Sequence, residues 1–183
     1  MSQTPPDMRY VVESNRGMIK KLELAIPGFR GYRKREDLRI ADNLLRIHLA
    51  DRMCRVCSAI EEVKRAASKK LDLNLVSVIG EVENSLRVLE KRLRHAEQGY
   101  SGVAPDYRIG DMELHTIYNY DSQLLDRTSA LEQGVASLQS HVITWDSVGI
   151  EREIGMLMTL VKDVERILNG RRDSLLAVVG VKR

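Results

Sequence analysis

The feature that most constrains the fold is a series of apolar residues at alternating four- and three-residue steps, sustained through several long segments. One series is Leu75, Ile79, Val82, Leu86, Leu89, Leu93 and Ala96, and another is Ile150, Ile154, Leu157, Val161, Val164 and Leu168. Residues that recur at this spacing lie along one side of an α-helix, which must be buried against other helices. The spacing therefore predicts an all-α protein, an antiparallel up-and-down bundle of four to five long helices with coiled-coil-like packing.

Breaks in the apolar series, two of them marked by glycine and proline, divide the chain into five helical segments. We expect helices over residues 7–25, 35–69, 75–97, 112–139 and 148–169, and we interpret Asn169 and Gly170 as the stop of the last helix. Residues 1–6 then form a flexible N-terminus, residues 7–170 the helical bundle, and residues 171–183 a short apolar and basic C-terminal tail. The length of 183 residues suits one domain.

The composition limits the partners and the location of the protein. The chain has 29 Lys and Arg residues against 26 Asp and Glu residues, so the charge alone does not indicate nucleic acid. The N-terminal residues lack the apolar run of a signal peptide, and no segment approaches the roughly 18 apolar residues of a membrane span. The two cysteines do not make a disulfide framework. We therefore expect a cytoplasmic protein with no transmembrane segment.

Aromatic and basic residues are concentrated in two of the connections between helices. Because short connections favour antiparallel neighbours, the connection after the first helix and the connection after the third lie at the same end of the bundle. We expect this basic-aromatic end to bind a partner. Its residues are Phe29, Arg30, Tyr32, Arg33, Lys34, Arg35, Tyr100, Tyr107 and Arg108. In the alternative interpretation, the aromatic side chains plug the open end of the bundle and the cations are solvated.

The same stretches carry a resemblance to known proteins. The segments IPGFRGYRKREDLRIADNLLR and RHAEQGYSG resemble parts of a family of small helical prokaryotic proteins that has no assigned activity. The resemblance implies no chemistry and no cofactor. It is consistent with family-level roles for Arg35, Glu36, Asp42, Gly99, Tyr100 and Gly102, and it supports placing the two segments together.

Polar residues interrupt the apolar series inside the predicted bundle. Asp121 occupies a position of the series in the fourth helix, and Asp42 lies at a similar depth on the second helix. A buried carboxylate needs a partner, because an unpaired buried charge is very costly. We expect Arg16 or Arg87 to be buried beside them in an ion pair that fixes the helix register. Alternatively, Asp42 and Asp121 form a carboxylate pair that binds a ligand or a metal.

Several catalytic and cofactor-binding motifs are absent from the sequence. None of the four histidines follows a glutamate by three residues, which excludes the di-iron bundle site. The phosphate-binding glycine loops and the Gly-x-Ser-x-Gly elbow are also missing. Cys54 and Cys57 have redox spacing but lie inside a helix, which favours a buried, inert pair over a metal shared between two subunits. We therefore expect no catalytic residue, no cofactor and no metal site.

These features favour a non-catalytic helical scaffold or adaptor that binds a protein partner through a helix face or through the basic-aromatic end. Self-association is expected because the second helix, at about 35 residues, would overhang neighbours of about 22–28 residues and expose apolar surface. A polyanion-binding module for nucleic acid or phosphate is one alternative. A peripheral membrane protein, attached through residues 174–181 and the following Lys182 and Arg183, is another.

Overall fold

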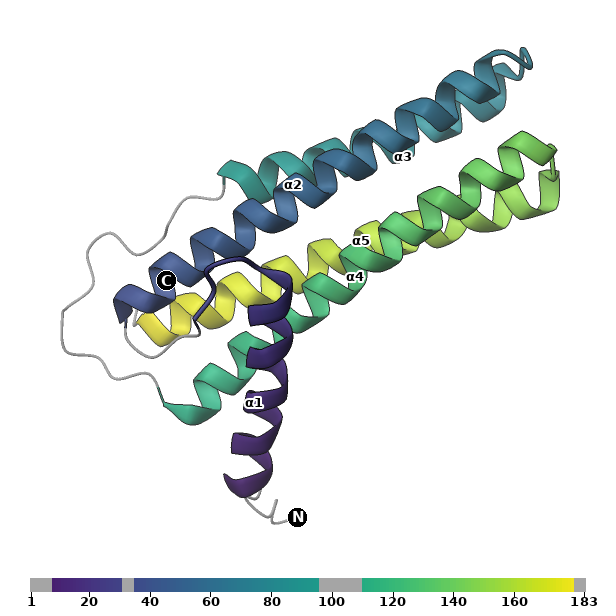
Figure 1. Ribbon diagram of the computed structural model, residues 1–183. Helices are drawn as coiled ribbons and strands as arrows, with labels where there is room; N and C mark the ends of the chain where they lie inside the picture. Colours follow the sequence, from purple (N-terminus) through teal and green to yellow (C-terminus); the bar gives the residue numbers. More distant parts are fainter. Residues whose placement is uncertain (1–7, 31–34, 96–109, 180–183) are drawn as a thin grey trace, which may run out of the picture. The chain divides into compact units, whose positions relative to one another are not determined.

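The structure is a computed structural model that describes residues 8–30, 35–95 and 110–179. These residues form the helices α1 (Met8–Ala25), α2 (Arg35–Ser68), α3 (Leu73–His95), α4 (Asp111–Thr144) and α5 (Ser147–Val179) (Figure 1). The described ranges contain no strand, and the prediction of an all-α helical bundle is confirmed. Among the same residues, no helix has an apolar stretch of the length that crossing a membrane requires.

The chain divides into two compact units, and α2, α4 and α5 contribute a segment to each of them. Unit 1 comprises Met1–Arg46, Glu97–Gln123 and Ile167–Arg183. Unit 2 comprises Ile47–Ala96 and Leu124–Arg166.

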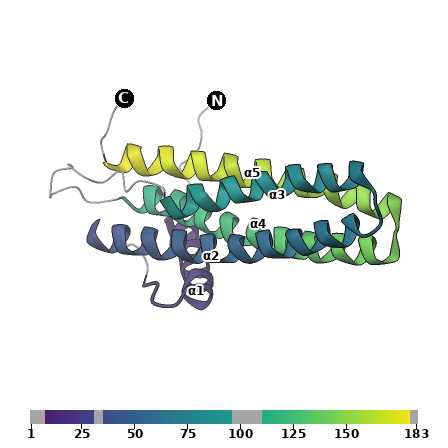
Figure 2. The ribbon, with the colours of Figure 1, turned by 90° about the horizontal axis from the view of Figure 1, so that it is seen from above.

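Unit 2 is a four-helix bundle made of two helical hairpins, α2–α3 and α4–α5. The turns of both hairpins lie at the same end of this unit (Figures 1 and 2). Its core is aliphatic, and the predicted apolar series supplies fully buried side chains from all four helices, among them Met53, Ile60, Leu86, Leu131 and Leu157. Ion pairs join each helix to its neighbours around the bundle, through Lys64–Glu83, Arg92–Glu165, Arg127–Asp163 and Arg52–Glu132.

Unit 1 combines α1 with the first part of α2, the first part of α4 and the last part of α5. Figure 1 shows α1 inclined to the other three helical segments. Leu22 and Ile26 are buried, at 0% and 1% exposure. Lys21 donates a hydrogen bond to Ser122 of α4 at 2.9 Å, and the Asn15 and His115 side chains are hydrogen-bonded at 2.8 Å. Apolar burial and these polar contacts together hold α1 on this unit.

The end of α5 differs from the sequence-based prediction. The helix continues to Val179, so the expected stop at Asn169 and Gly170 is wrong, and residues 171–179 are helical rather than a tail. A Cβ atom at Gly170 would lie 2.9 Å from the Tyr120 hydroxyl oxygen. This glycine therefore permits α5 to approach α4 closely, and it does not end the helix.

The helix lengths agree with the expected overhang of the second helix for one neighbour only. α3 is shorter than α2, at 23 residues, but the other two long helices are not. α2 and α4 have 34 residues each and α5 has 33, because α4 runs on to Thr144 and α5 to Val179. α2 is therefore not long enough to expose an apolar side beyond α4 and α5. Self-association therefore needs a different structural basis.

The ion pair between Arg52 and Glu132 predicts a specific acid response. Arg52 donates hydrogen bonds to both carboxylate oxygens of Glu132, at 2.9 and 2.6 Å, and this lowers the pKa of Glu132 below its ordinary value of 4.5. The Glu132 carboxyl group then releases its proton more readily in the folded state than in the unfolded chain. The pair therefore stabilises the fold above pH 4.5, and this contribution is lost as the pH falls through the lowered pKa.

We expect Glu132→Gln to flatten the acid limb of the stability curve, measured by urea unfolding at several values between about pH 5 and pH 3. Glu62→Gln is the control, because Glu62 contacts Arg65 at 4.0 Å on the surface. Identical acid limbs for wild type and Glu132→Gln would contradict this account of the pair.

Candidate functional site

The structure describes the side chains of only two residues of the predicted basic-aromatic end. Phe29 is buried, at 4% exposure, and Arg30 is exposed. The other side chains of the set lie outside the described residues, namely Tyr32, Arg33, Lys34, Arg35, Tyr100, Tyr107 and Arg108. The burial of Phe29 agrees with the interpretation of the aromatic residues as a plug. Partner binding at this end stays a prediction.

A buried charge cluster occupies the interior of unit 1, and it consists of Asp42, Arg46, Asp121 and Arg171. Asp42 is 3% exposed and Asp121 is 0% exposed. Arg171 of α5 lies between them and donates to an oxygen of each carboxylate at 2.5 Å. Arg46 donates to the other oxygen of Asp42 at 2.9 Å. The cluster balances two carboxylates with two guanidinium groups and ties α2, α4 and α5 together.

The expected partners of the buried carboxylates were wrong. Arg16 is exposed, and Arg87 lies half-exposed on unit 2, where it pairs with Glu61 and Glu83. Arg87 is next to the fully buried Leu86 in the sequence and so faces away from the core. In the alternative interpretation, a ligand or a metal lies between Asp42 and Asp121. The Arg171 guanidinium occupies this place instead. Within the described ranges, no three His, Cys, Asp or Glu side chains are placed to hold a metal ion.

The buried charge cluster predicts a large effect of one apolar substitution. Arg171→Met removes the cation between Asp42 and Asp121, and we expect it to lower the free energy of unfolding by about 3–5 kcal/mol. The neighbouring Arg172→Met is the control, since Arg172 is exposed and pairs with the exposed Asp173. We expect that change to cost less than about 0.5 kcal/mol. Chemical denaturation measures the free energy of unfolding of both variants. Equally small decreases would show that the buried charge cluster does not stabilise unit 1.

The two cysteines have different environments, so the expectation of a buried pair was wrong for Cys54. Cys54 is exposed and Cys57 is buried. Burial raises the pKa of the Cys57 thiol to about 11. This thiol is therefore protonated at neutral pH and is a poor nucleophile.

Alkylation distinguishes the two thiols. At about pH 8 we expect iodoacetamide to modify Cys54 in the folded protein and to modify Cys57 only after unfolding, because only the thiolate reacts. Mass spectrometry of the wild type and of Cys54→Ser measures this. Rapid modification of folded Cys54→Ser would show that Cys57 is accessible.

The most exposed apolar side chains gather where the two hairpin turns of unit 2 lie together. Among the large apolar side chains that the structure describes, five are at least 70% exposed. Four of these are in or beside the turns, and they are Leu71 at 84%, Leu73 at 81%, Ile143 at 70% and Val148 at 77%. The Lys70 ammonium lies 5.6 Å from the centre of the Trp145 ring and links the turns. These four residues and Trp145 form the apolar end of unit 2.

Both turns hold a bulky residue in a backbone conformation that favours glycine. The φ angle is +60° at Leu71 and +58° at Trp145. This left-handed conformation costs a side-chain-bearing residue roughly 1–2 kcal/mol. Glycine is the residue usually found here after a helix. Each turn thus carries a large exposed or half-exposed side chain at a position where glycine would be more stable.

Hydrogen bonds close the backbone of both turns. The Asp146 N–H donates to the His141 carbonyl oxygen at 2.9 Å, which closes the end of α4 around Trp145. Asp72 caps α3 by accepting from the Leu75 N–H at 2.9 Å, and Asp146 caps α5 by accepting from the Gly149 N–H at 3.1 Å. The bond from Gly149 lowers the pKa of Asp146. The apolar side chains therefore project from well-capped helix ends.

The sequence does not predict the apolar end, because the four-three apolar series identifies only the buried side of each helix. Residues 70–74 and 140–147 break the series, and such breaks are normally read as solvent-exposed connections. A usable signal was present in the sequence, since neither break contains glycine although each follows a long helix.

Comparisons with family models, with curated proteins and with solved structures find no match to this chain. The resemblance to a family of small helical prokaryotic proteins therefore stays a prediction.

Proposed function

We propose that the protein is a non-catalytic helical scaffold or adaptor that binds a protein partner through the apolar end of unit 2. The observation that carries this proposal is the exposure of four aliphatic side chains beside two turns that hold Leu71 and Trp145 in left-handed conformations. Contiguous exposed apolar patches mark interaction sites. Aromatic side chains are enriched where protein interfaces are most fully buried.

The charges around the apolar end support a protein partner over a polyanion. Residues 68–75 and 143–150 carry two lysines and two aspartates, so the turns have no net charge. The aspartates accept backbone hydrogen bonds as helix caps. Burial of apolar surface would then drive binding, and the affinity would depend little on salt, in contrast to polyanion binding.

Two further expectations from the sequence belong to the same proposal. A cytoplasmic location suits a chain with 30% charged residues and two free cysteines. Coiled-coil-like packing between the long helices is supported by the burial of the four-three apolar series.

A polar version of the apolar end tests the proposal. The polar-end variant combines Leu71→Asn, Leu73→Ser, Ile143→Thr and Val148→Thr. All four side chains are at least 70% exposed, and asparagine tolerates the left-handed conformation, so we expect the free energy of unfolding to change by less than about 1 kcal/mol. We expect the proteins that co-purify with the tagged wild type from its own cells to be lost, at low and at high salt.

Leu24→Ser is the matched control, because Leu24 is 81% exposed on α1 and lies outside the apolar end. We expect this variant to retain the same proteins as the wild type. If the folded polar-end variant retains all of them in equal amount, the apolar end is not the binding surface.

A further inference from the structure

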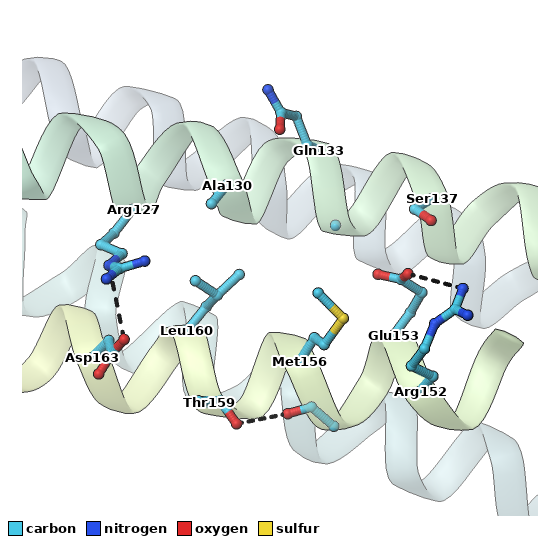
Figure 3. A pocket seen from close by; sticks show the side chains of 12 residues that line it. Arg127, Ala130, Gln133, Ser137, Arg152, Glu153, Met156, Thr159, Leu160 and Asp163 are labelled. Carbon is cyan, nitrogen blue, oxygen red and sulfur yellow. Dashed lines mark hydrogen bonds and ion pairs between the residues drawn. The ribbon is translucent and has the colours of Figure 1, made fainter.

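A groove runs between α4 and α5 on the surface of unit 2. Its volume is about 710 Å³, and small residues of α4, namely Ala130, Gly134 and Ser137, line one side. Figure 3 shows Met156 and Leu160 of α5 within the space between the helices. Met156 is 52% exposed. The groove therefore presents apolar side chains to solvent between the middle part of α4 and the first half of α5.

An ion pair lies at each end of the groove (Figure 3). At one end Arg127 pairs with Asp163 at 3.8 Å, and at the other Arg152 pairs with Glu153 at 3.6 Å. On α5, the exposed Arg152 thus precedes the apolar centre and the half-buried Asp163 follows it, while Glu153 beside Arg152 is buried. Two copies of α5 that run antiparallel would therefore place the cation of one copy opposite the anion of the other.

An antiparallel pairing of two α5 helices matches these residues in a single register. The register that sets Arg152 opposite Asp163 of a second copy also sets Gly155 opposite Leu160 and Met156 opposite Thr159. Each contact occurs twice, because a two-fold axis relates the copies. Opposite charges face each other at both ends, and apolar groups meet in the centre.

Gly155 lines the groove on the exposed side of α5. Apart from its chain neighbours and the backbone of its own helix, no atom of the described residues would lie within 4 Å of a Cβ atom there, and the residue is exposed. At Gly134, by contrast, a Cβ atom would lie 2.9 Å from the Leu157 side chain, so packing inside this chain requires that glycine. Nothing in the described part of the chain requires a glycine at position 155, where it weakens the helix. Close approach of a second helix would require it.

We propose that the α5 face from Arg152 to Asp163 is the interface of an antiparallel homodimer, with the groove receiving α5 of the second copy. This inference goes beyond the proposed function and does not use the apolar end. The polar-end variant should therefore dimerise like the wild type, so the two proposals succeed or fail separately.

The first test is steric and uses two comparable glycines. Gly155→Leu should raise the dimer dissociation constant at least ~tenfold in sedimentation equilibrium without lowering the melting temperature. Gly17→Leu is the control, since Gly17 of α1 is also exposed and, outside its own helix, a Cβ atom there would have no described atom within 4 Å. That variant should dimerise like the wild type. A wild type that sediments only at 20.8 kDa up to its solubility limit, or a dimer unaffected by Gly155→Leu, would overturn the proposal.

The second test uses charge and the two-fold axis. Arg152→Glu alone and Asp163→Lys alone each place like charges together twice in a homodimer, so each should sediment as a monomer. In an equimolar mixture, opposite charges meet at both contacts of a mixed dimer, since the two unsubstituted residues face each other at one and the two substituted residues at the other. The mixture should therefore recover the dimer. Circular dichroism confirms that both variants are folded. Dimers formed by either variant alone, or a mixture that stays monomeric, would show that this register is wrong.

Discussion

The architecture of unit 1 depends on the burial of charge. Arg171 lies between Asp42 and Asp121, and the two carboxylates come from different helices. Aliphatic side chains that repeat every seven residues pack nearly as well when a helix shifts by one repeat. A guanidinium that must meet two buried carboxylates does not allow this shift, because an unpaired charge in the interior is very costly. We infer that the cluster selects one register of α2, α4 and α5.

This dependence explains what the sequence could and could not predict. The helices and their buried sides follow from the apolar series, and the positions of Asp42 and Asp121 on those helices indicate that they need a partner. Arg171 could not be identified, because Asn169 and Gly170 have the composition of a helix stop. Glycine serves two purposes in helices, as a terminator and as a point of close approach. Only the position of Tyr120 beside Gly170 distinguishes them here.

Both candidate surfaces contain residues that are unfavourable for their local backbone conformation. The packing of the described residues does not explain these residues. Gly134 and Gly170 are explained by side chains packed against them, whereas Gly155 has no such neighbour among the residues that the structure describes. Gly28, with φ of +83°, shows the usual residue in a left-handed position, whereas Leu71 and Trp145 depart from it. Positions of this kind are expected at functional sites, where binding rather than folding determines the residue.

Trp145 is the single tryptophan of the chain, so it reports directly on the apolar end. Protein labelled with 5-fluorotryptophan gives one ¹⁹F resonance, which can be recorded in buffer and in an extract of the cells that make the protein. If the apolar end binds a partner, the resonance of the wild type shifts or broadens in the extract, and that of the polar-end variant keeps its position and width. An unchanged wild-type resonance in the extract would contradict the central claim that this end is a binding surface.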